Sequence, residues 1–226
     1  MQTGYHSSTV SMKALLASKS WRSSMVSEPG SQPRRFSSRG VRRALISAAC
    51  VSLLLCFIGM TRLVFFPERL TPTRADVVFV LGPAEADRLE LGERLVEHGY
   101  ADALVISAPD NESRFGKNQI SACVSERPYF VFCGRSIPYT TQGEMALLQR
   151  LSDEYSWDSV LVVTSRTHAS RAALYAARCF DGSSSVIWTD PPLSYERGLQ
   201  QLAYQTGGFV KAFTLTNGCV DEWSLW

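Results

Sequence analysis

Residues 164–171, Thr-Ser-Arg-Thr-His-Ala-Ser-Arg, follow an apolar run and bring together residue types that bind anions and transfer protons. We expect a helix to open within this segment. The free backbone N–H groups of a helix start favour an anion, and Ser and Thr hydroxyls add donors. His168 and Arg171 are three residues apart, so they share one helical face. Arg171 could grip a phosphate or carboxylate at two points, and His168 could donate or accept a proton.

Two other polar segments are expected at the same edge of a sheet. Gly82 ends an apolar run and is followed by Asp87-Arg88, and residues 140–144 read Thr-Thr-Gln-Gly-Glu at the start of a predicted helix. Ligands of open α/β sheets bind beyond the carboxyl ends of the strands. Arg88 could approach a ligand bound at this edge, and Glu144 could orient a base or serve as a general base. The candidate site thus has a catalytic set, Glu144, Ser165 and His168, and a ligand-binding set, Gly82, Arg88, Thr141, Ser165 and Arg171.

The same spacing also permits a purely structural interpretation. Thr141, Ser165 and Thr167 would then cap helices, Glu144 would close its capping box, and the arginines would be surface or structural charges. The sequence has no Gly-x-Gly-x-x-Gly, Gly-Lys-Ser/Thr or Gly-x-Ser-x-Gly motif, so no cofactor is predicted. Zinc is not expected, because there is no Cys-x-x-Cys pair and only His98 and His168 follow the apolar N-terminal segment.

The elements that would position these residues alternate between strands and helices. Continuous apolar runs predict strands buried on both faces, and four segments show helical patterns. A polar loop insertion is expected over 109–127, and Gly207-Gly208 is expected to interrupt the last helix. The pattern predicts an α/β fold, a Rossmann-like three-layer α/β/α sandwich with a mostly parallel sheet. Its strands are expected at 76–82, 103–107, 129–133, 159–164 and 185–189, and its helices at 87–98, 141–155, 168–180 and 193–215.

A long apolar segment precedes this domain. Ala44–Met60 carries no charge, and a helix over residues 41–66 would be about 39 Å long, enough to cross a hydrocarbon core of about 30 Å. A cleavable signal peptide and a buried core helix are the alternatives, and we favour an uncleaved signal anchor. The predicted organisation is a disordered basic tail (1–40), a transmembrane anchor (41–66), a linker (67–74) and an α/β domain (75–226).

Charge predicts the orientation of this anchor. Residues 1–43 hold eight Lys/Arg and one acid, a net +7, whereas the rest of the chain has a net charge of −5. Positive flanks stay in the cytoplasm, so we expect a single-pass protein of the cell membrane with its N-terminus inside and its domain outside. The acidic balance of the domain argues against nucleic-acid binding.

Six cysteines agree with this placement. Cys50 and Cys56 lie in the apolar segment, and the domain holds four, Cys123, Cys133, Cys179 and Cys219. An even number in an oxidising compartment suggests two disulfides. Cys123 with Cys133 would close a local loop, and Cys179 with Cys219 would tie a helix end to the C-terminal segment. Four free buried thiols are the alternative.

Five motifs of the domain occur in a fairly specific combined order. They are Val77–Gly82, Asp87-Arg88-Leu89, Thr141-Gln142-Gly143-Glu144, Val162-Val163-Thr164-Ser165 with His168 and Arg171-Ala172, and Cys179-Phe180-Asp181-Gly182. Through these motifs, residues 75–219 resemble the YdcF/SanA/ElyC-like family of bacterial envelope proteins, and its anchored actinobacterial members in particular. The resemblance implies a Rossmann-like fold, a domain outside the cytoplasmic membrane, and a function in the cell-envelope barrier and peptidoglycan metabolism.

Three functions are compatible with these observations. The first is an envelope enzyme or binding protein for a phosphorylated or otherwise anionic small molecule, such as a lipid-linked cell-wall precursor. The second is a non-catalytic envelope scaffold, whose signature would be an exposed apolar patch without an enclosed polar pocket. The third, transfer from S-adenosylmethionine, ranks last, because that cofactor is cytosolic and the domain is expected outside. The sequence leaves open whether the domain is an enzyme.

Overall fold

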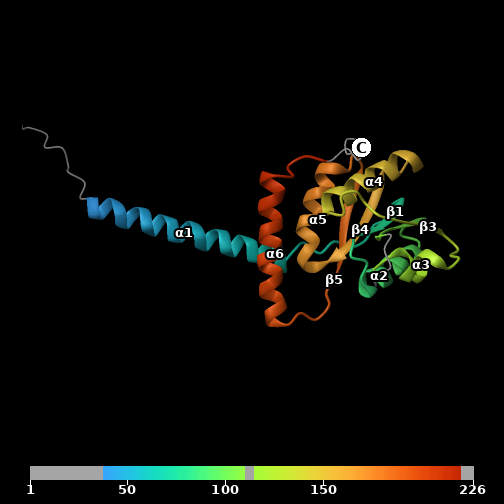
Figure 1. Cartoon of the computed structure of the whole chain (residues 1–226), viewed down its shortest axis with the longest axis horizontal. Helices are drawn as coiled ribbons and strands as arrows, with labels where there is room; N and C mark the ends of the chain where they lie inside the picture. The colour runs from blue at the N-terminus through green and yellow to red at the C-terminus, as the bar shows by residue number, and fades with distance from the viewer. Residues whose placement is uncertain (1–37, 110–114, 220–226) are drawn as a thin grey trace, which may run out of the picture. The chain divides into compact units, whose positions relative to one another are not determined.

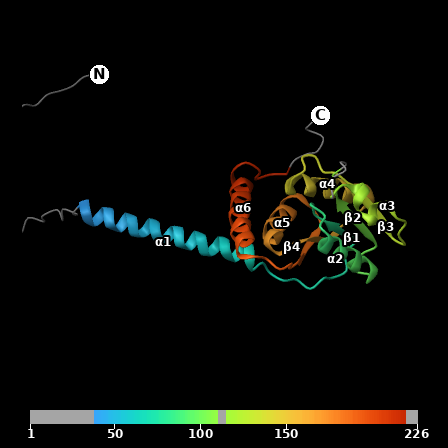
Figure 2. The same ribbon diagram turned by 60° about the horizontal axis from the view of Figure 1, so that its bottom comes forward.

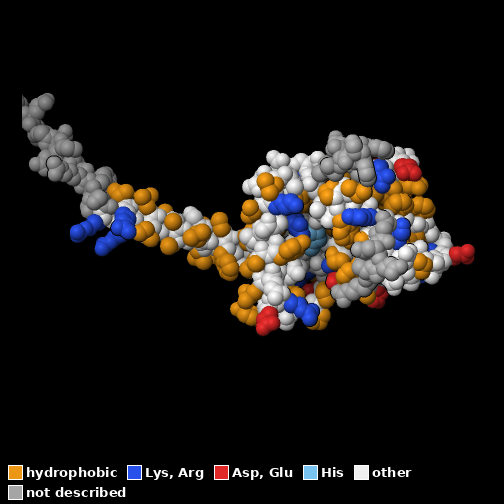
Figure 3. All heavy atoms as spheres, viewed as in Figure 1, with side chains coloured by type: hydrophobic (Ala, Val, Ile, Leu, Met, Phe, Trp, Pro, Cys, Tyr) orange, Lys and Arg blue, Asp and Glu red, His pale blue; other side chains and the backbone are white. Residues whose placement is uncertain are grey.

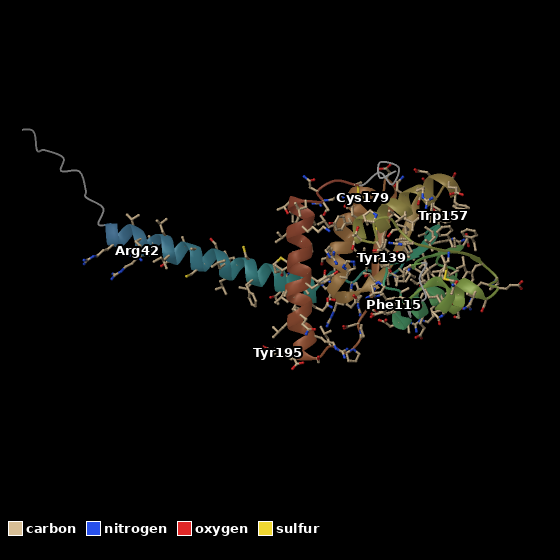
Figure 4. All side chains as sticks on the ribbon, in the orientation of Figure 1. Arg42, Phe115, Tyr139, Trp157, Cys179 and Tyr195 are labelled. Carbon is tan, nitrogen blue, oxygen red and sulfur yellow. A yellow bond between two sulfur atoms is a disulfide. The ribbon has the colours of Figure 1, made fainter. Side chains whose placement is uncertain are left out.

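The structure, a computed structural model of the chain, describes residues 38–109 and 115–219. It begins with helix α1 (Ser38–Phe65), whose residues 39–65 are long and apolar enough to cross a bilayer. Basic side chains, Arg42 among them, gather at the N-terminal end of α1, and the rest of the helix is mainly apolar up to Arg62 in its last turn (Figures 3 and 4). The disordered tail expected over residues 1–40 lies almost wholly outside the described residues.

The domain is built on a sheet of five parallel strands in the order β3-β2-β1-β4-β5. Strands β2 and β3 therefore extend the sheet to one side of β1, and β4 and β5 extend it on the other side. The expected α/β architecture with a parallel sheet is confirmed (Figure 1). The strands are β1 (Val77–Val80), β2 (Ala103–Ser107), β3 (Phe130–Gly134), β4 (Ser159–Ser165) and β5 (Ser183–Thr189).

Helices cover both faces of this sheet, and alternate strand residues point to opposite faces, so the domain has two separate hydrophobic cores. Val77 and Phe79 of β1 pack with α4 (Thr141–Tyr155) and α5 (Arg166–Cys179). Val78 and Val80 pack on the other face with α2 (Ala86–Glu97). Helix α6 (Tyr195–Thr214) packs on α5, and the two lie side by side in both ribbon views (Figures 1 and 2).

Most element boundaries agree with the sequence within a few residues. The loop expected over 109–127 also holds a short 3-10 turn, η1 (Lys117–Gln119), and a one-turn helix, α3 (Ser121–Val124). Gly99 ends α2 with a φ of +75°, a left-handed conformation that glycine adopts without steric cost.

Two local expectations are wrong. Thr140, not Thr141, caps α4, since its side chain accepts a hydrogen bond from the backbone N–H of Gly143 at 3.3 Å. The Glu144 side chain does not close a capping box, because it bonds to another loop. Helix α6 also runs through Gly207-Gly208 without the expected interruption, since its packing on α5 outweighs the low helix propensity of two glycines.

The two glycines of α6 should respond differently to alanine. A Cβ at Gly207 would meet nothing within 4 Å, so Gly207→Ala should stabilise the domain by about 1 kcal/mol through helix propensity. A Cβ at Gly208 would lie 3.0 Å from the side chain of Arg171, which would have to move. Urea unfolding of the full chain should therefore show no gain for Gly208→Ala. Equal gains for both variants would contradict the packing of Arg171 on α6.

Two disulfides close the domain, and both expected pairs are present. Cys123 bonds to Cys133, and Cys179 at the end of α5 bonds to Cys219. The only free cysteines in the described part of the chain, Cys50 and Cys56, are exposed on α1. Disulfides of this kind persist in oxidising compartments.

Candidate functional site

The site lies where the strand order reverses, between the carboxyl ends of β1 and β4. Val80 at the end of β1 is paired with Val163 of β4 on one side and Ile106 of β2 on the other. In open parallel sheets, the loops that leave neighbouring strands in opposite directions leave a crevice at this point. The loop after β1, the start of α4 and the start of α5 all meet here.

Glu144 is buried at the centre of this region, with only 4% of its surface exposed. One carboxylate oxygen accepts a hydrogen bond from the backbone N–H of Gly82 at 2.6 Å, which ties α4 to the loop after β1. Gly82 has no room for a side chain, since a Cβ there would collide with the Tyr139 hydroxyl and lie 3.1 Å from the Glu144 carboxylate. The N–H of Gly82 is thus already engaged, and its expected part in ligand binding would require Glu144 to release it.

Burial raises the pKa of Glu144 to about 7. Three effects oppose this rise: a nearby Ser107 hydroxyl, the Gly82 N–H, and the positive charges of Arg88 and Arg171. A carboxyl with a pKa near neutrality exchanges a proton under physiological conditions, which is the property of a general acid or base. Tyr139, on the loop before α4 (Figure 4), is 37% exposed, and partial burial and the Glu144 charge raise its pKa to about 12, so it stays protonated.

Arg88 is buried beneath the loop after β1. Its guanidinium donates to the carbonyl oxygen of Pro83 at 2.9 Å and lies 3.3 Å from the Glu85 carboxylate. Arg88 therefore positions the loop that carries Gly82, in addition to supplying positive charge near Glu144. Its Nε atom is buried without a hydrogen-bond partner among the described residues.

His168, on the first turn of α5, is buried against the start of α4. Its Nε2 lies 3.3 Å from the Thr141 hydroxyl, so the predicted pair of Thr141 and His168 meets in the structure. Burial, with the charges of Arg171 and Arg88, lowers the pKa of His168 to about 3, although Gln205 opposes this. The imidazole is therefore neutral at physiological pH. At that pH the ring can donate or accept hydrogen bonds, but it carries no extra proton that it could release to a ligand.

Arg171 lies one turn further along α5 and faces α6. Its Nε donates to the side-chain oxygen of Gln205 at 2.9 Å, and its guanidinium lies 5.5 Å from the centre of the Tyr204 ring. No other hydrogen bond joins the Arg171 guanidinium to a described residue, so its remaining N–H groups can bind a ligand.

Ser165 is the predicted site residue that the structure leaves least engaged. It is the N-cap residue of α5, yet its side chain makes no capping hydrogen bond, and it is only partly buried. No hydrogen bond connects its hydroxyl to Glu144, His168 or Arg171. The structure brings Gly82, Arg88, Thr141, Glu144, His168 and Arg171 into one neighbourhood, whereas Ser165 lies at its border.

Several buried polar atoms at this edge of the sheet make no well-formed hydrogen bond to a described residue. They come from the last residue of β2, from the penultimate residue of β4 and from α5: Ser107 Oγ, Thr164 Oγ1 and His168 Nδ1. Ser136 Oγ, after β3, is in the same condition. Two of these residues have a polar neighbour, since Ser107 lies near the Glu144 carboxylate and His168 lies near Gln205. Burying such groups unpaired is costly, and each commonly has a water, ion or ligand as its partner.

A cavity of about 450 Å³ opens beside these residues, between the start of α4, α5 and α6. Its polar and aromatic lining includes Tyr139, Thr141, Gln142, Arg171, Tyr175, Tyr204 and Lys211. Arg171 and Lys211 give it a positive character with no carboxylate among its lining residues. Thr141 and Arg171 connect it to His168 and Glu144.

Sequence reasoning missed Tyr139, Ser107, Gln205 and Lys211. Ser107 carried a signal, because a hydroxyl at the end of an apolar strand is expected at a ligand-binding edge. Tyr139 and Gln205 carried none, since their roles depend on how a loop and α6 fold back on α4 and α5. No group of three or more His, Cys, Asp or Glu side chains suited to a metal ion occurs within residues 38–109 and 115–219.

Comparisons with known proteins identify no relative of this chain. No protein-family model matches the chain, and searches of curated proteins and of solved structures gave no match. The resemblance drawn from the sequence motifs therefore stays a prediction, and the site itself carries the functional argument.

Proposed function

We propose that this chain is a single-pass membrane protein with a Rossmann-like domain outside the cytoplasm that binds a phosphorylated or otherwise anionic small molecule. The observation that carries the proposal is the group of buried polar atoms at the carboxyl edge of the sheet that lack a well-formed hydrogen bond, Ser107 Oγ, Thr164 Oγ1 and His168 Nδ1. The charges of two arginines, Arg88 and Arg171, act on both Glu144 and His168 in this region. Unpaired donors in a positive environment favour an anion.

The placement outside the cytoplasm rests on three supports. Helix α1 is long and apolar enough to span a bilayer. The basic flank before it favours a cytoplasmic N-terminus. Two disulfides fit an oxidising compartment beyond the membrane. A signal anchor with the domain held at the outer face of the cell membrane accounts for all three.

The cavity suggests what kind of anion would fit. Arg171 and Lys211 could bind a phosphate, while the rings of Tyr139, Tyr175 and Tyr204 offer apolar surface for the attached group. Tyrosine rings beside a cationic pocket suit a phosphate joined to a sugar or to a lipid. A lipid-linked cell-wall precursor has this chemistry, and the resemblance to the YdcF/SanA/ElyC-like envelope family points the same way.

The site also has the elements of acid–base chemistry. Glu144, with its pKa near 7, would accept or donate a proton, and the neutral His168 imidazole would orient a ligand through Nδ1. The nearby arginines would stabilise negative charge that develops on a phosphoryl or acyl group. We propose first that the domain binds the anion, and in addition that Glu144 acts on it as a general acid or base. A non-catalytic scaffold is less favoured, because a positively charged cavity is present.

Arg171→Ala should weaken anion binding by at least about tenfold, because a charge-assisted hydrogen bond contributes roughly 1.5–3 kcal/mol. The measurement is calorimetric titration of the detergent-solubilised full chain with a polyprenyl monophosphate, the matching polyprenol and inorganic phosphate. We expect the monophosphate to bind and the polyprenol not to bind. Binding of inorganic phosphate would show that the phosphoryl group suffices.

The matched control is Arg94→Ala, which removes an exposed arginine of α2 that pairs with Glu90 on the surface. This variant should bind as the wild type does. If Arg171→Ala bound the monophosphate as tightly as the wild type, the assignment of the anion to this cavity would be wrong. If the wild type bound none of the phosphorylated probes, the proposed ligand class would be wrong.

A further inference from the structure

Helix α6 exposes a line of large apolar side chains, of which only Phe213 has a described side chain, that of Arg178, over its ring. Tyr195, Leu199, Val210 and Phe213, called here the α6 stripe, have exposed fractions of 81%, 52%, 58% and 61%. Their spacings of 4, 11 and 3 residues place all four on one side of a helix with 3.6 residues per turn. The stripe extends over about 27 Å of helix, and Tyr195 projects outward from its first turn (Figure 4).

The other sides of α6 have different characters. Gln205, Phe209 and Ala212 are buried and face the domain. Glu196, Gln200 and Lys211 are exposed and polar, and Tyr204, which is 64% exposed, lies on the same side with the Arg171 guanidinium 5.5 Å from its ring centre. An exposed helix with one apolar side and one polar side is the pattern of a helix that lies in the plane of a membrane surface, with its apolar side in the acyl boundary. Apolar patches of this kind on a folded domain mark interaction surfaces.

The segment that joins α1 to the domain is held against β5, the strand that precedes α6 in the chain. The Trp188 indole N–H, on β5, donates to the carbonyl oxygen of Glu68 at 3.1 Å, and the Arg69 guanidinium lies 4.4 Å from the Trp188 ring centre. Strand β5 ends at Thr189, and residues 190–194 connect it to α6. Glu68 is only three residues beyond Phe65, so at most about 11 Å of extended chain separates the last residue of α1 from this point.

We propose that the α6 stripe lies on the outer surface of the bilayer that α1 crosses. This inference rests on the membrane anchorage proposed above. A bilayer is the occupant favoured here because the short, anchored linker keeps it within reach of α6. Tyr195 and Arg197 at the start of the helix, and Lys211 near its end, suit the headgroup region.

This orientation has a consequence for the cavity. Ala203, Gly207 and Lys211 of α6 line it, so the cavity would open at the level of the headgroups. A ligand whose phosphate is attached to a membrane lipid could then reach Arg171 without leaving the bilayer. The membrane contact therefore selects a membrane-resident ligand over a freely soluble one.

The test places a fluorescent probe on α6 of the full chain in vesicles of phosphatidylcholine and phosphatidylglycerol. Cys50→Ala and Cys56→Ala remove the free thiols, and the nitrobenzoxadiazole label is attached to Val210→Cys or Leu199→Cys on the stripe. Gln200→Cys and Glu196→Cys on the polar side are the matched controls. Lipids with a nitroxide on the acyl chain quench probes that enter the membrane.

We expect both stripe probes to shift their emission to the blue and to be quenched roughly threefold more than the control probes, since only the stripe would enter the acyl boundary. Equal quenching on both sides of α6 would overturn the inference, while alkali-resistant flotation with the vesicles would still support the anchor. A blue shift without quenching, together with crosslinks between copies, would show that a second copy covers the stripe, and would also overturn it. Loss of flotation would refute the anchor and this inference together, whereas the calorimetric test of the cavity would be unaffected.

Discussion

Replacing Glu144 with Gln should make the domain more stable relative to the wild type as the pH rises, by about 3 kcal/mol between roughly pH 4 and pH 8. Burial raises the pKa of this carboxyl from 4.5 to about 7, so the folded state holds a proton that the unfolded state has already released. The stabilisation from the protonated carboxyl is complete below pH 4.5 and is lost as the pH rises to 7. Gln keeps an oxygen that can accept the Gly82 N–H but has no proton to lose.

His168 should produce the opposite dependence. Burial lowers its pKa from 6.5 to about 3, so the folded state keeps the imidazole neutral while the unfolded state takes up a proton. The stabilisation from the neutral ring is present above pH 6.5 and is lost as the pH falls to 3. Between pH 4.5 and 6.5 the two effects have equal and opposite slopes, so they cancel in the wild type. Each single variant should therefore reveal the slope of the other residue.

Urea unfolding at several pH values measures both slopes. Glu144→Gln should become more stable with rising pH between about 3 and 6.5, and His168→Asn should become less stable between about 4.5 and 7. Glu90→Gln makes the same chemical change at an exposed position of α2 and serves as the control. A Glu144→Gln variant that tracked the wild type at every pH would show that the carboxyl is not buried in its protonated form.

The sequence predicted the strands well because parallel strands buried on both faces must be apolar throughout. The runs at residues 77–81 and 160–163 have this property, and their ends fixed the edge at which the site lies. Arg88, Thr141, Glu144, His168 and Arg171 were expected at that edge because each follows a predicted strand or opens a helix near one. The structure places them in one neighbourhood for this topological reason.

The finer roles of these residues could not be predicted from local pattern. Glu144 fits a capping box in sequence, yet in the structure it reaches across to Gly82, 62 residues away. Arg88 is predicted to bind a ligand, but in the structure its guanidinium also donates to the carbonyl oxygen of Pro83 in the loop after β1. Gly207 and Gly208 signal a break, but packing on Arg171 and α5 keeps α6 continuous. In each case a long-range contact decided the outcome, and local sequence carries no information about such contacts.

The disulfide between Cys179 and Cys219 should contribute the larger part of the covalent stabilisation. It closes a segment of 40 residues, and the loss of chain entropy in the unfolded state for such a loop corresponds to about 4 kcal/mol. The bond between Cys123 and Cys133 closes only 10 residues and corresponds to about 3 kcal/mol. Cys179→Ala with Cys219→Ala should therefore lower the melting temperature of the domain by roughly 10 °C, and more than the other double variant does.

The Cys179–Cys219 bond should also affect the cavity, because it holds the segment after α6 in place. Gln142 at the start of α4 donates to the carbonyl oxygen of Gly218 at 2.6 Å, and Arg178 donates to that of Ala212 at 2.8 Å. Thr216 and Lys211, at this end of α6, line the cavity. Without the bond, this wall should loosen and anion binding should weaken, whereas the variant that lacks the Cys123–Cys133 bond should bind normally. Thermal unfolding and titration of both variants measure these two effects. Equal loss of binding in both would mean that the cavity depends on the overall stability of the domain and not on the closure of α6, because only one of the two bonds lies beside it.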